Sequence, residues 1–595
     1  MAFNKYYQDE LSYLRDMGAE FSRQNPGLSK FLSEEGNDPD VERLFEGVSF
    51  LTGRLRQKLD DELPEVTHAL LGLLWPHYLR PLPSMSVLEF KPIENALIEG
   101  KRIPRGEAVQ SVEVENTSCR FRSCYDVDIY PIELHQLSST NQSDGASLTL
   151  DFQLEPGAAS ENLGLDKLRL FLHGDREMHI SQGLYLWLFR YLDKLELCVQ
   201  LRSGQQTRIQ LGTKAITPVG FADDEALLPY TNRSFNGYRL LQEYFSLPEK
   251  FLFVDINNLG EHLQVPMIES FSLKFTFNRK FDSQLRLQKG HIRLYCTPII
   301  NLFSADADPI RVDHRRQEYM VRPSHEKQEH IELFSIDHVS GSLRGQSKRY
   351  HYPAFESFDH EIRSDSNDKQ VFFSLKRRLS TLQSGLDSFI SFVHVDSRDT
   401  VPPTETISLE LTCTNRKLPE VLRAGDIIYP TADSVEFASF RNITRVTNAL
   451  QPPLRDGLHW QLISQMALHY RSLSRLDSLR TLLACYDFRA FFDRQAERAS
   501  QQMLEGIQSI STETRDRIIK GVPVRTLQTK LQLRESKFGA KGIQGESTMF
   551  LFASVLNGFF SQYANINAHH ELEVEGLDNG EIYRWQIQSG QHFLL

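Results

Sequence analysis

The chain has 595 residues, which corresponds to roughly three to five domains at about 100–200 residues each. Lysine and arginine number 67 and aspartate and glutamate 78, so the formal net charge is −11. With 40% hydrophobic and 24% charged residues, the composition excludes a disordered or collagen-like chain, and the negative charge disfavours nucleic acid as a partner.

Targeting and membrane-spanning patterns are absent from the sequence. Asp9 and Glu10 stand where a signal peptide needs an apolar core. No apolar run approaches the ~18 residues of a membrane helix, so direct membrane insertion is not expected. Six cysteines are too few for a disulfide framework in a chain of this length. We therefore expect a reduced, cytoplasmic protein.

The first 85 residues are expected to form a helical region. A helix over residues 3–21 has a wide apolar and aromatic side, which includes Tyr6, Tyr7, Leu11 and Leu14. A second helix is predicted where apolar residues recur at spacings of three and four: Val41, Leu44, Phe45, Val48, Leu51, Leu55 and Leu59. A shorter helix follows over residues 66–75, and prolines then stop regular structure.

From Met85 the hydrophobic period changes to two, which predicts a β-rich domain with inserted helices over residues 86–300. Strands are expected where apolar and polar residues alternate, at 148–154, 168–172, 195–201 and 271–277. Residues 183–192 have helical spacing, and the Ser-, Asn- and Gly-rich residues 137–145 are expected to form a flexible loop.

The remaining sequence divides into a second β-rich, loop-heavy domain (301–455) and a C-terminal helical and α+β domain (456–595). Residues 301–352 are polar, and strands are expected at 389–395 and 407–411. Further on, the expected elements are a helical stretch at 458–483, a strand at 527–533, a helix at 548–563, and strands near Leu572 and at 582–587. The predicted fold class is therefore multidomain α+β.

Two metal-like patterns fail on spacing. His325 and His330 are five residues apart, whereas a zinc-binding helix needs its two histidines at i and i+4. Cys119 and Cys124 have no second close cysteine pair to complete a four-ligand site. We expect a solvated polar loop around the histidines and two unligated cysteines.

A glycine-rich stretch, with Gly539, Gly542 and Gly545, lies between a predicted strand and a predicted helix. A phosphate-binding loop requires a lysine before its Ser or Thr, but here Glu546 precedes Ser547 and its charge would repel phosphate. The stretch is expected to be a connection, with Ser547 or Thr548 capping the helix.

The strongest enzymatic alternative is a metal-dependent hydrolase that uses Asp306, Asp308 and nearby histidines. Nothing near the two aspartates in the sequence completes such a site. No catalytic, cofactor-binding or metal-binding residue is predicted. The basic run Arg344, Lys348 and Arg349 is interpreted as a loop that contacts a partner protein.

The apolar helical faces at residues 3–21 and 41–59 point to association. Such faces pack either against other chains in a helix bundle or as a cap on the core of the same chain. The residue pattern alone leaves these two alternatives open.

Several blocks resemble one family along nearly the whole chain. The first three are RLFEGVSFLT at 43–52, RQKLDDELP at 56–64 and LLGLLWPHYLRP at 70–81. They are similar to the N-terminal signature of the TssF family, also called ImpG or VasA, which are baseplate subunits of type VI secretion systems. Similar blocks follow at 237–245, 248–251, 296–303, 413–419, 555–556 and 563–567.

This resemblance implies a structural role without catalytic residues. In that family two copies join one TssG subunit in a wedge, organised like the wedge of the phage T4 baseplate. Six wedges surround the VgrG spike hub, TssK trimers link each wedge to the membrane complex, and TssE and the sheath dock on it. The implied location is the cytoplasmic, inner-membrane-docked baseplate, where tube and sheath assemble for contractile effector delivery. A secreted effector of the same machine is the remaining alternative.

Overall fold

A computed structural model of the chain consists of two units, Met1–Leu79 with Pro453–Ala467, and Arg80–Pro452 with Leu468–Leu595. It describes residues 7–17 except 9 and 16, residues 39–60, and residues 71–590 except 73–74, 94–95, 159–162, 176, 231–234, 283–284, 314, 326, 344–348, 356–370, 381–384, 395–403, 432–433, 454–474, 520, 541, 565 and 567. For residues 54–60 only the backbone is described.

The first unit is helical over most of its described residues. The helix α3 (Pro39–Asp60) confirms the predicted amphipathic helix, and Pro39 at its start has the fixed φ that suits a first turn. Residues 7–17 are helical at every described position. Arg15 donates a hydrogen bond to Glu42 at 2.6 Å, which holds this segment against α3. In the part of the chain that is described, no helix is long and apolar enough to cross a bilayer.

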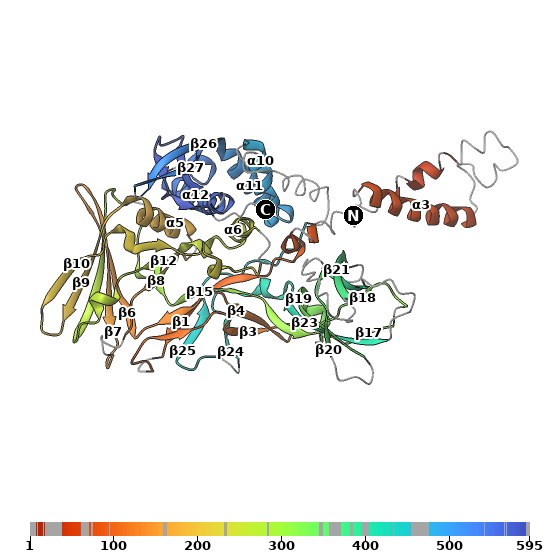
Figure 1. The fold of residues 1–595 in the computed structure, drawn as a ribbon, viewed down its shortest axis with the longest axis horizontal. Coiled ribbons are helices and arrows are strands. Elements are labelled where there is room, and N and C mark those ends of the chain that lie inside the picture. The colour runs from red at the N-terminus through yellow and green to blue at the C-terminus, as the bar shows by residue number, and fades with distance from the viewer. Residues whose placement is uncertain are drawn as a thin grey trace. The chain divides into compact units, whose positions relative to one another are not determined.

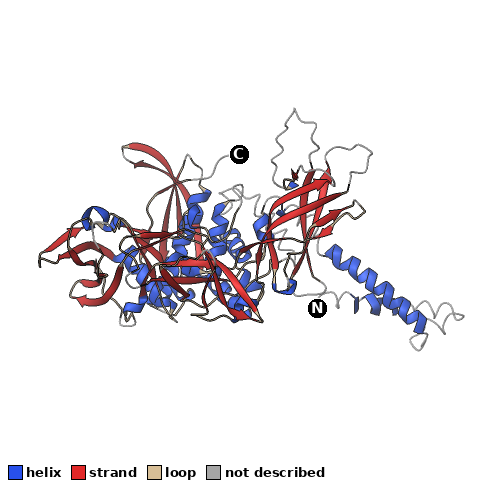
Figure 2. Ribbon diagram, turned by 90° about the horizontal axis from the view of Figure 1, so that it is seen from below, coloured by secondary structure: helices blue, strands red, loops and turns tan. Residues whose placement is uncertain are grey.

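Strands predominate in the second unit (Figures 1 and 2), beginning with a six-stranded antiparallel sheet that joins distant parts of the sequence. Its strands, in order, are β24 (Ile427–Pro430), β3 (Ala108–Val114), β4 (Thr117–Ser123), β15 (Cys296–Ile300), β1 (Met85–Pro92) and β25 (Ala438–Asn442). Asn442 brings the two edge strands together: its backbone oxygen accepts from Gly425 N at 2.9 Å, and its side-chain oxygen accepts from Ile427 N at 3.0 Å.

A five-stranded antiparallel sheet carries the predicted alternation of apolar and polar residues. Its strands, in order, are β10 (Gln206–Gln210), β9 (Leu192–Leu201), β13 (Ile268–Phe277), β7 (Gly145–Leu154) and β6 (Ile132–Gln142). The inward face is aromatic, with Phe152 and Phe271 stacked at 4.9 Å between ring centroids. The loop expected at 137–145 is wrong, because Leu137–Gln142 belong to the edge strand β6, whose polar residues face water.

A third sheet and the central helices form the most buried part of the second unit. The sheet contains β11 (Ile216–Pro218), β12 (Phe253–Ile256), β8 (Leu168–Leu172) and β14 (Ile292–Leu294). The helices are α5 (Met178–Leu186), α6 (Asn236–Ser246), the single turn α7 (Gly260–Leu263) and α12 (Ile543–Tyr563). Helix α12 is apolar on nearly every side, which is typical of a buried helix. It packs against α5 through Tyr185 and Phe550, and against Phe235, beside α6, through Phe559.

The segment expected to be loop-heavy, residues 301–352, instead contains a long strand, β19 (Glu332–Leu343). It pairs with β20 (Arg349–His351) and β23 (Glu405–Thr414), and β23 also pairs with β16 (Phe303–Asp306) and β17 (Ile310–Val312) in the same sheet. A smaller sheet contains β18 (Tyr319–Met320), β22 (Leu386–His394) and β21 (Val371–Leu379). Their shared core includes Val339, Ile390 and Cys413, none of which is exposed. The short pair β2 (Lys101–Ile103) and β5 (Val127–Ile129) stands apart.

The C-terminal part combines helices with a mixed sheet. The helices α10 (Leu476–Tyr486) and α11 (Arg494–Gly506) precede a sheet of β26 (Ile507–Ile519), β27 (Val522–Leu533), β28 (His569–Gly576), β29 (Ile582–Arg584) and β30 (Gln588–Ser589). β27 and β28 are parallel, and α12 is the crossover between them. The sequence pattern predicted neither α11 nor β26. The fold class is multidomain α+β, as predicted.

Candidate partner interface

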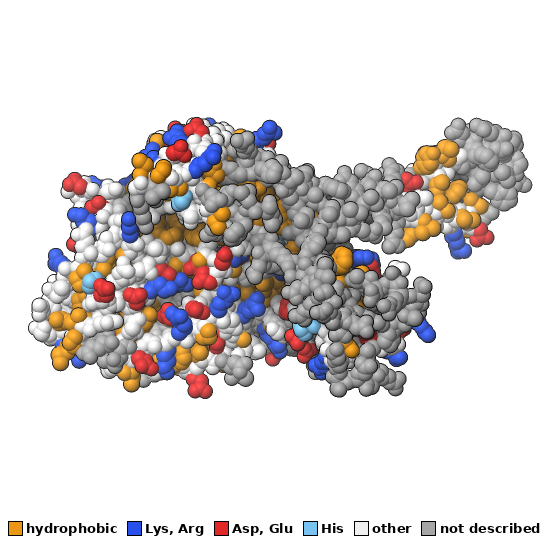
Figure 3. All heavy atoms as spheres, viewed as in Figure 1, with side chains coloured by type: hydrophobic (Ala, Val, Ile, Leu, Met, Phe, Trp, Pro, Cys, Tyr) orange, Lys and Arg blue, Asp and Glu red, His pale blue; other side chains and the backbone are white. Residues whose placement is uncertain are grey.

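A row of apolar side chains is exposed on α3. Leu44, Val48 and Leu51 lie at i, i+4 and i+7, so they share one side of the helix, and their exposed fractions are 65, 39 and 68%. Phe50, on another side of the helix, is 48% exposed. Hydrophobic side chains gather over this helix in Figure 3. Scattered surface leucines are common, but a contiguous apolar patch marks an interaction site.

The neighbouring side of α3 is covered. Val41 and Phe45 are partly buried, and Ser49 is fully buried. The helix therefore has apolar residues both on its covered side and on its exposed side. Burying an exposed leucine contributes about 2 kcal/mol, so covering Leu44 and Leu51 offers a considerable driving force for association.

The other helical candidates differ in exposure. Leu11 is buried at 6%, Tyr7 and Leu14 are partly buried, and Tyr6 lies outside the described residues. Leu55 and Leu59 belong to α3, but their side chains are not among those described. Two exposed residues were not among the candidates, Tyr13 at 59% and Met17 at 47%. Their i, i+4 spacing was the signal that could have identified them.

The basic candidate loop is described only in part. Arg344 and Lys348 lie outside the described residues. Arg349 begins the strand β20, is exposed, and lies opposite Ser342 of β19. This loop remains a candidate on the sequence pattern.

The residues of the hydrolase alternative do not converge. Asp306 lies on β16 opposite Glu410, and the Asp308 carboxylate accepts from the Gln328 amide at 3.4 Å. His330 is buried rather than solvated, and its Nδ1 lies 2.8 Å from Thr117 Oγ1, so the expected polar loop is wrong at this position. Among the described residues, no group of three His, Cys, Asp or Glu is arranged to hold a metal ion.

The glycine-rich stretch serves close packing. A Cβ at Gly545 would lie 2.4 Å from the backbone oxygen of Glu535. The helix α12 begins at Ile543, so the predicted capping by Ser547 or Thr548 is wrong: both hydroxyls donate to the oxygen of Gln544 inside the helix.

Glu546, which follows Gly545, is buried at 5% exposure. Its Oε1 accepts from the hydroxyls of Tyr191 at 2.5 Å and Tyr583 at 3.0 Å. Arg279 lies 3.2 Å from the same oxygen. This carboxylate therefore holds separate segments together at the place where a phosphate loop would have bound its ligand.

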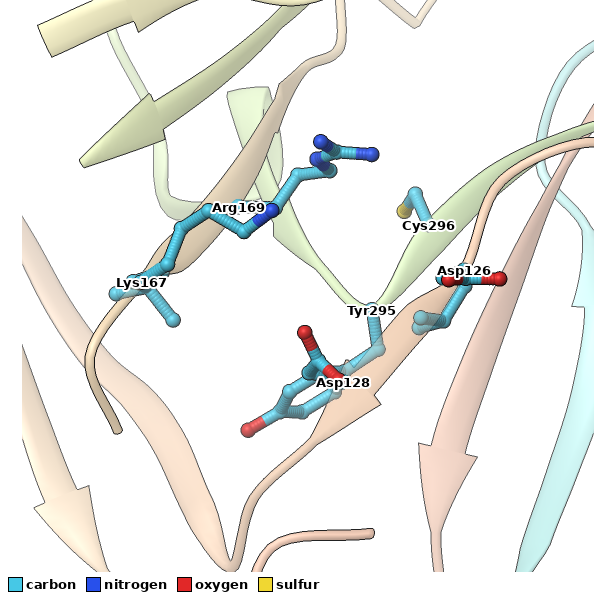
Figure 4. A pocket seen from close by; sticks show the side chains of 8 residues that line it. Asp126, Asp128, Lys167, Arg169, Tyr295 and Cys296 are labelled. Atoms are coloured by element: carbon cyan, nitrogen blue, oxygen red, sulfur yellow. The ribbon is translucent and has the colours of Figure 1, made fainter. Parts of the chain in front are cut away.

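A small pocket lies beside β5, β8 and β15 (Figure 4). Its volume of about 20 Å³ has room for one water molecule, whereas ligand pockets typically measure about 300–1,000 Å³. Arg169 lines it and donates to both carboxylate oxygens of Asp255, at 2.7 and 2.8 Å. Burial opposes the charge of Arg169, but the hydrogen bond and charge of Asp255 outweigh it and raise its pKa. The arrangement is that of a structural ion pair.

Comparisons with known proteins agree along the whole chain. The model of the family described as "Type VI secretion system, TssF" matches residues 1–592. The type VI secretion system component TssF1 of Pseudomonas aeruginosa is 30% identical, over 98% of both chains. A chain of the TssK-TssF-TssG baseplate subcomplex is 30% identical, with a TM-score of 0.76 over 93% of this chain and 99% of that one. A chain of the type VI baseplate complex is 26% identical, with a TM-score of 0.64 over 99% of each.

Proposed function

Since this chain belongs to the TssF family and is a structural component of the type VI secretion baseplate wedge, we propose that two copies of it assemble with one TssG subunit. The observation that supports association with a partner is the exposed row Leu44, Val48 and Leu51 on α3, and the ratio of two to one is what membership of the family implies. An apolar row on a long helix fits a partner helix with apolar residues at the same spacing. We place this row in a helical contact with TssG or with the second copy.

The related structure contains TssK and TssG together with TssF, which supports the same two partners for this chain. Membership of the family further supports contacts with TssK trimers, TssE, the VgrG hub and the tube and sheath. It also supports a place in the cytoplasm, at a baseplate docked on the inner membrane.

The role that we propose is architectural and not catalytic. Asp306 and Asp308 lie among backbone and amide contacts, and the pocket at Arg169 is too small for an ordinary substrate. Near-stoichiometric zinc or manganese in the purified full-length chain would instead favour the hydrolase alternative.

Co-expression of the full chain with TssG, followed by light scattering, tests the stoichiometry. Two copies of 68.7 kDa contribute 137.4 kDa, and the mass of one TssG is added. That total is the expected result. A chain that stays at 68.7 kDa in the presence of TssG would overturn the proposal.

A further inference from the structure

The strands β26 and β27 form a ribbon that extends beyond the rest of its sheet. β26 is the outermost strand, and β27 pairs with β28 only from Thr526 onward. Residues 513–518 of β26 are all exposed, and Ile518 is 80% exposed. Within the described residues, no strand pairs with the outer edge of β26. Such an edge is a template for another strand.

The side chains on this edge alternate in charge. Glu513 and Arg515 lie on the same face of β26 and form an ion pair at 2.9 Å, with both side chains about half exposed. Further along that face, Arg517 pairs with Glu571 of β28 at 2.9 Å. An edge that carried only one sign of charge would repel a copy of itself. The edge of β26 carries both signs, so a second copy can approach it.

The geometry of antiparallel strands limits how two copies of one strand can pair. Residues opposite one another must both direct their backbone groups either toward or away from the neighbour. When two copies of one strand pair in this way, the two-fold axis that relates them must therefore pass through a residue and not between two residues. A centre at Glu513 places two glutamates opposite each other, and a centre at Arg515 places two arginines opposite each other, which is unfavourable.

A centre at Thr514 avoids both conflicts. Glu513 of each copy then lies opposite Arg515 of the other, so two ion pairs become a four-charge cluster. On the other face Thr514 meets Thr514, and the highly exposed Ile518 meets Ile510. The charged face and the apolar positions thus select the same register.

We propose that β26 is a self-association edge, through which two copies of this chain join by antiparallel pairing centred on Thr514. The proposal rests on the proposed function in one respect, because a baseplate brings several copies of the chain together. It adds a contact made by strands, separate from the helical contact proposed for α3.

Cysteine cross-linking of the full chain, with TssG present, tests the register. In the Thr514→Cys variant the two new thiols face each other at the strand separation that a disulfide requires. We expect a TssF–TssF band of 137.4 kDa, twice 68.7 kDa, on a non-reducing gel under mild oxidation. The matched control is Thr512→Cys, which places the two cysteines about 13 Å apart, and the unmodified chain controls for its six cysteines, none of which is classed as exposed.

Charge reversal provides a second, independent readout. Glu513→Arg or Arg515→Glu alone places like charges opposite each other, and we expect self-association to weaken about tenfold, or ~1.4 kcal/mol. The double variant with both changes restores opposite charges and should restore association to the original level. Sedimentation velocity over a concentration series measures both effects.

TssG binding is measured in every sample, so that a failure of β26 pairing can be distinguished from a failure of the chain to assemble with TssG. Equal cross-linking of Thr514→Cys and Thr512→Cys, with TssG bound, would overturn the β26 pairing and leave the wedge proposal intact. Cross-linking of Thr514→Cys to a different subunit would also overturn it. Failure of the unmodified chain to bind TssG would overturn the wedge proposal itself.

Discussion

Lys250 and Glu243 form an ion pair in which neither side chain is exposed to solvent: Lys250 Nζ donates to Glu243 Oε2. The other carboxylate oxygen, Oε1, accepts from the backbone amides of Leu227 at 2.8 Å and Leu228 at 2.9 Å. Burial lowers the pKa of Lys250, and the charge of Glu243 counteracts that effect. One carboxylate on α6 thereby joins the loop before the helix to the turn after it.

Glu243→Ala is expected to destabilise the second unit by about 3–5 kcal/mol, because it leaves a buried ammonium and two amides without their acceptor. Chemical denaturation followed by circular dichroism measures the loss. The double variant Glu243→Leu with Lys250→Met removes both charges and should recover much of the stability. If the single variant unfolds at the same denaturant concentration as the unmodified chain, the pair has no such role.

The burial of His570 is expected to lower the free energy of unfolding in acid. It lies on β28 with no exposed surface, and its Nε2 is 3.1 Å from Thr529 Oγ1. Burial lowers its pKa to about 3, whereas a histidine in an unfolded chain titrates near 6.5. Between those values the unfolded chain binds the proton and the folded chain does not, so stability falls as pH falls, by about 2 kcal/mol at pH 5.

His570→Gln should remove this part of the acid dependence, since an amide does not titrate. Thermal unfolding at pH 7.5, 6 and 5 measures the slope for each variant. Thr529→Val, which keeps the imidazole but removes its hydrogen-bond partner, serves as the control and should retain the slope. An unchanged slope in His570→Gln would show that other groups cause the acid sensitivity.

Local sequence patterns were sufficient to predict the helices and strands in which buried residues recur at a regular spacing. The strands β7 and β13 alternate cleanly because one face is buried, and α3 has three- and four-residue spacing. The second half of the polar edge strand β6 has the composition of a loop, because residues such as Ser139 and Thr140 face water and follow no apolar period.

The sequence pattern could not predict which side of α3 is exposed. Val41, Leu44 and Phe45 fit one apolar helical face equally well, but only Leu44 is strongly exposed. Which flank is covered depends on contacts with distant residues, such as the pairing of Arg15 with Glu42. Likewise, the burial of Glu243 and Lys250 depends on tertiary packing, so a local hydrophobic period could not reveal it.

Two glycines should respond in opposite ways to alanine. At Gly545 the added Cβ would lie 2.4 Å from the Glu535 oxygen, so we expect a loss of stability of several kcal/mol or failure to fold. At Gly47, inside α3, nothing lies within 4 Å of the added atom. Gly47→Ala should therefore raise stability by about 0.5–1 kcal/mol. Thermal unfolding compares the two variants, and a loss of stability in Gly47→Ala would mean that this side of α3 is closely packed.

The row on α3 yields the prediction that bears most directly on assembly. In Leu44→Asp with Leu51→Asp, two carboxylates replace exposed leucines, so the isolated chain should fold with an unchanged circular dichroism spectrum. Burying those charges against a partner would cost several kcal/mol, and co-purification with TssG should be lost. Arg43→Asp, at an exposed position of the same helix, changes the net charge by the same two units and should leave binding intact. Normal TssG binding by the double variant would show that the row is not the interface, whereas unfolding would show that it packs within its own chain.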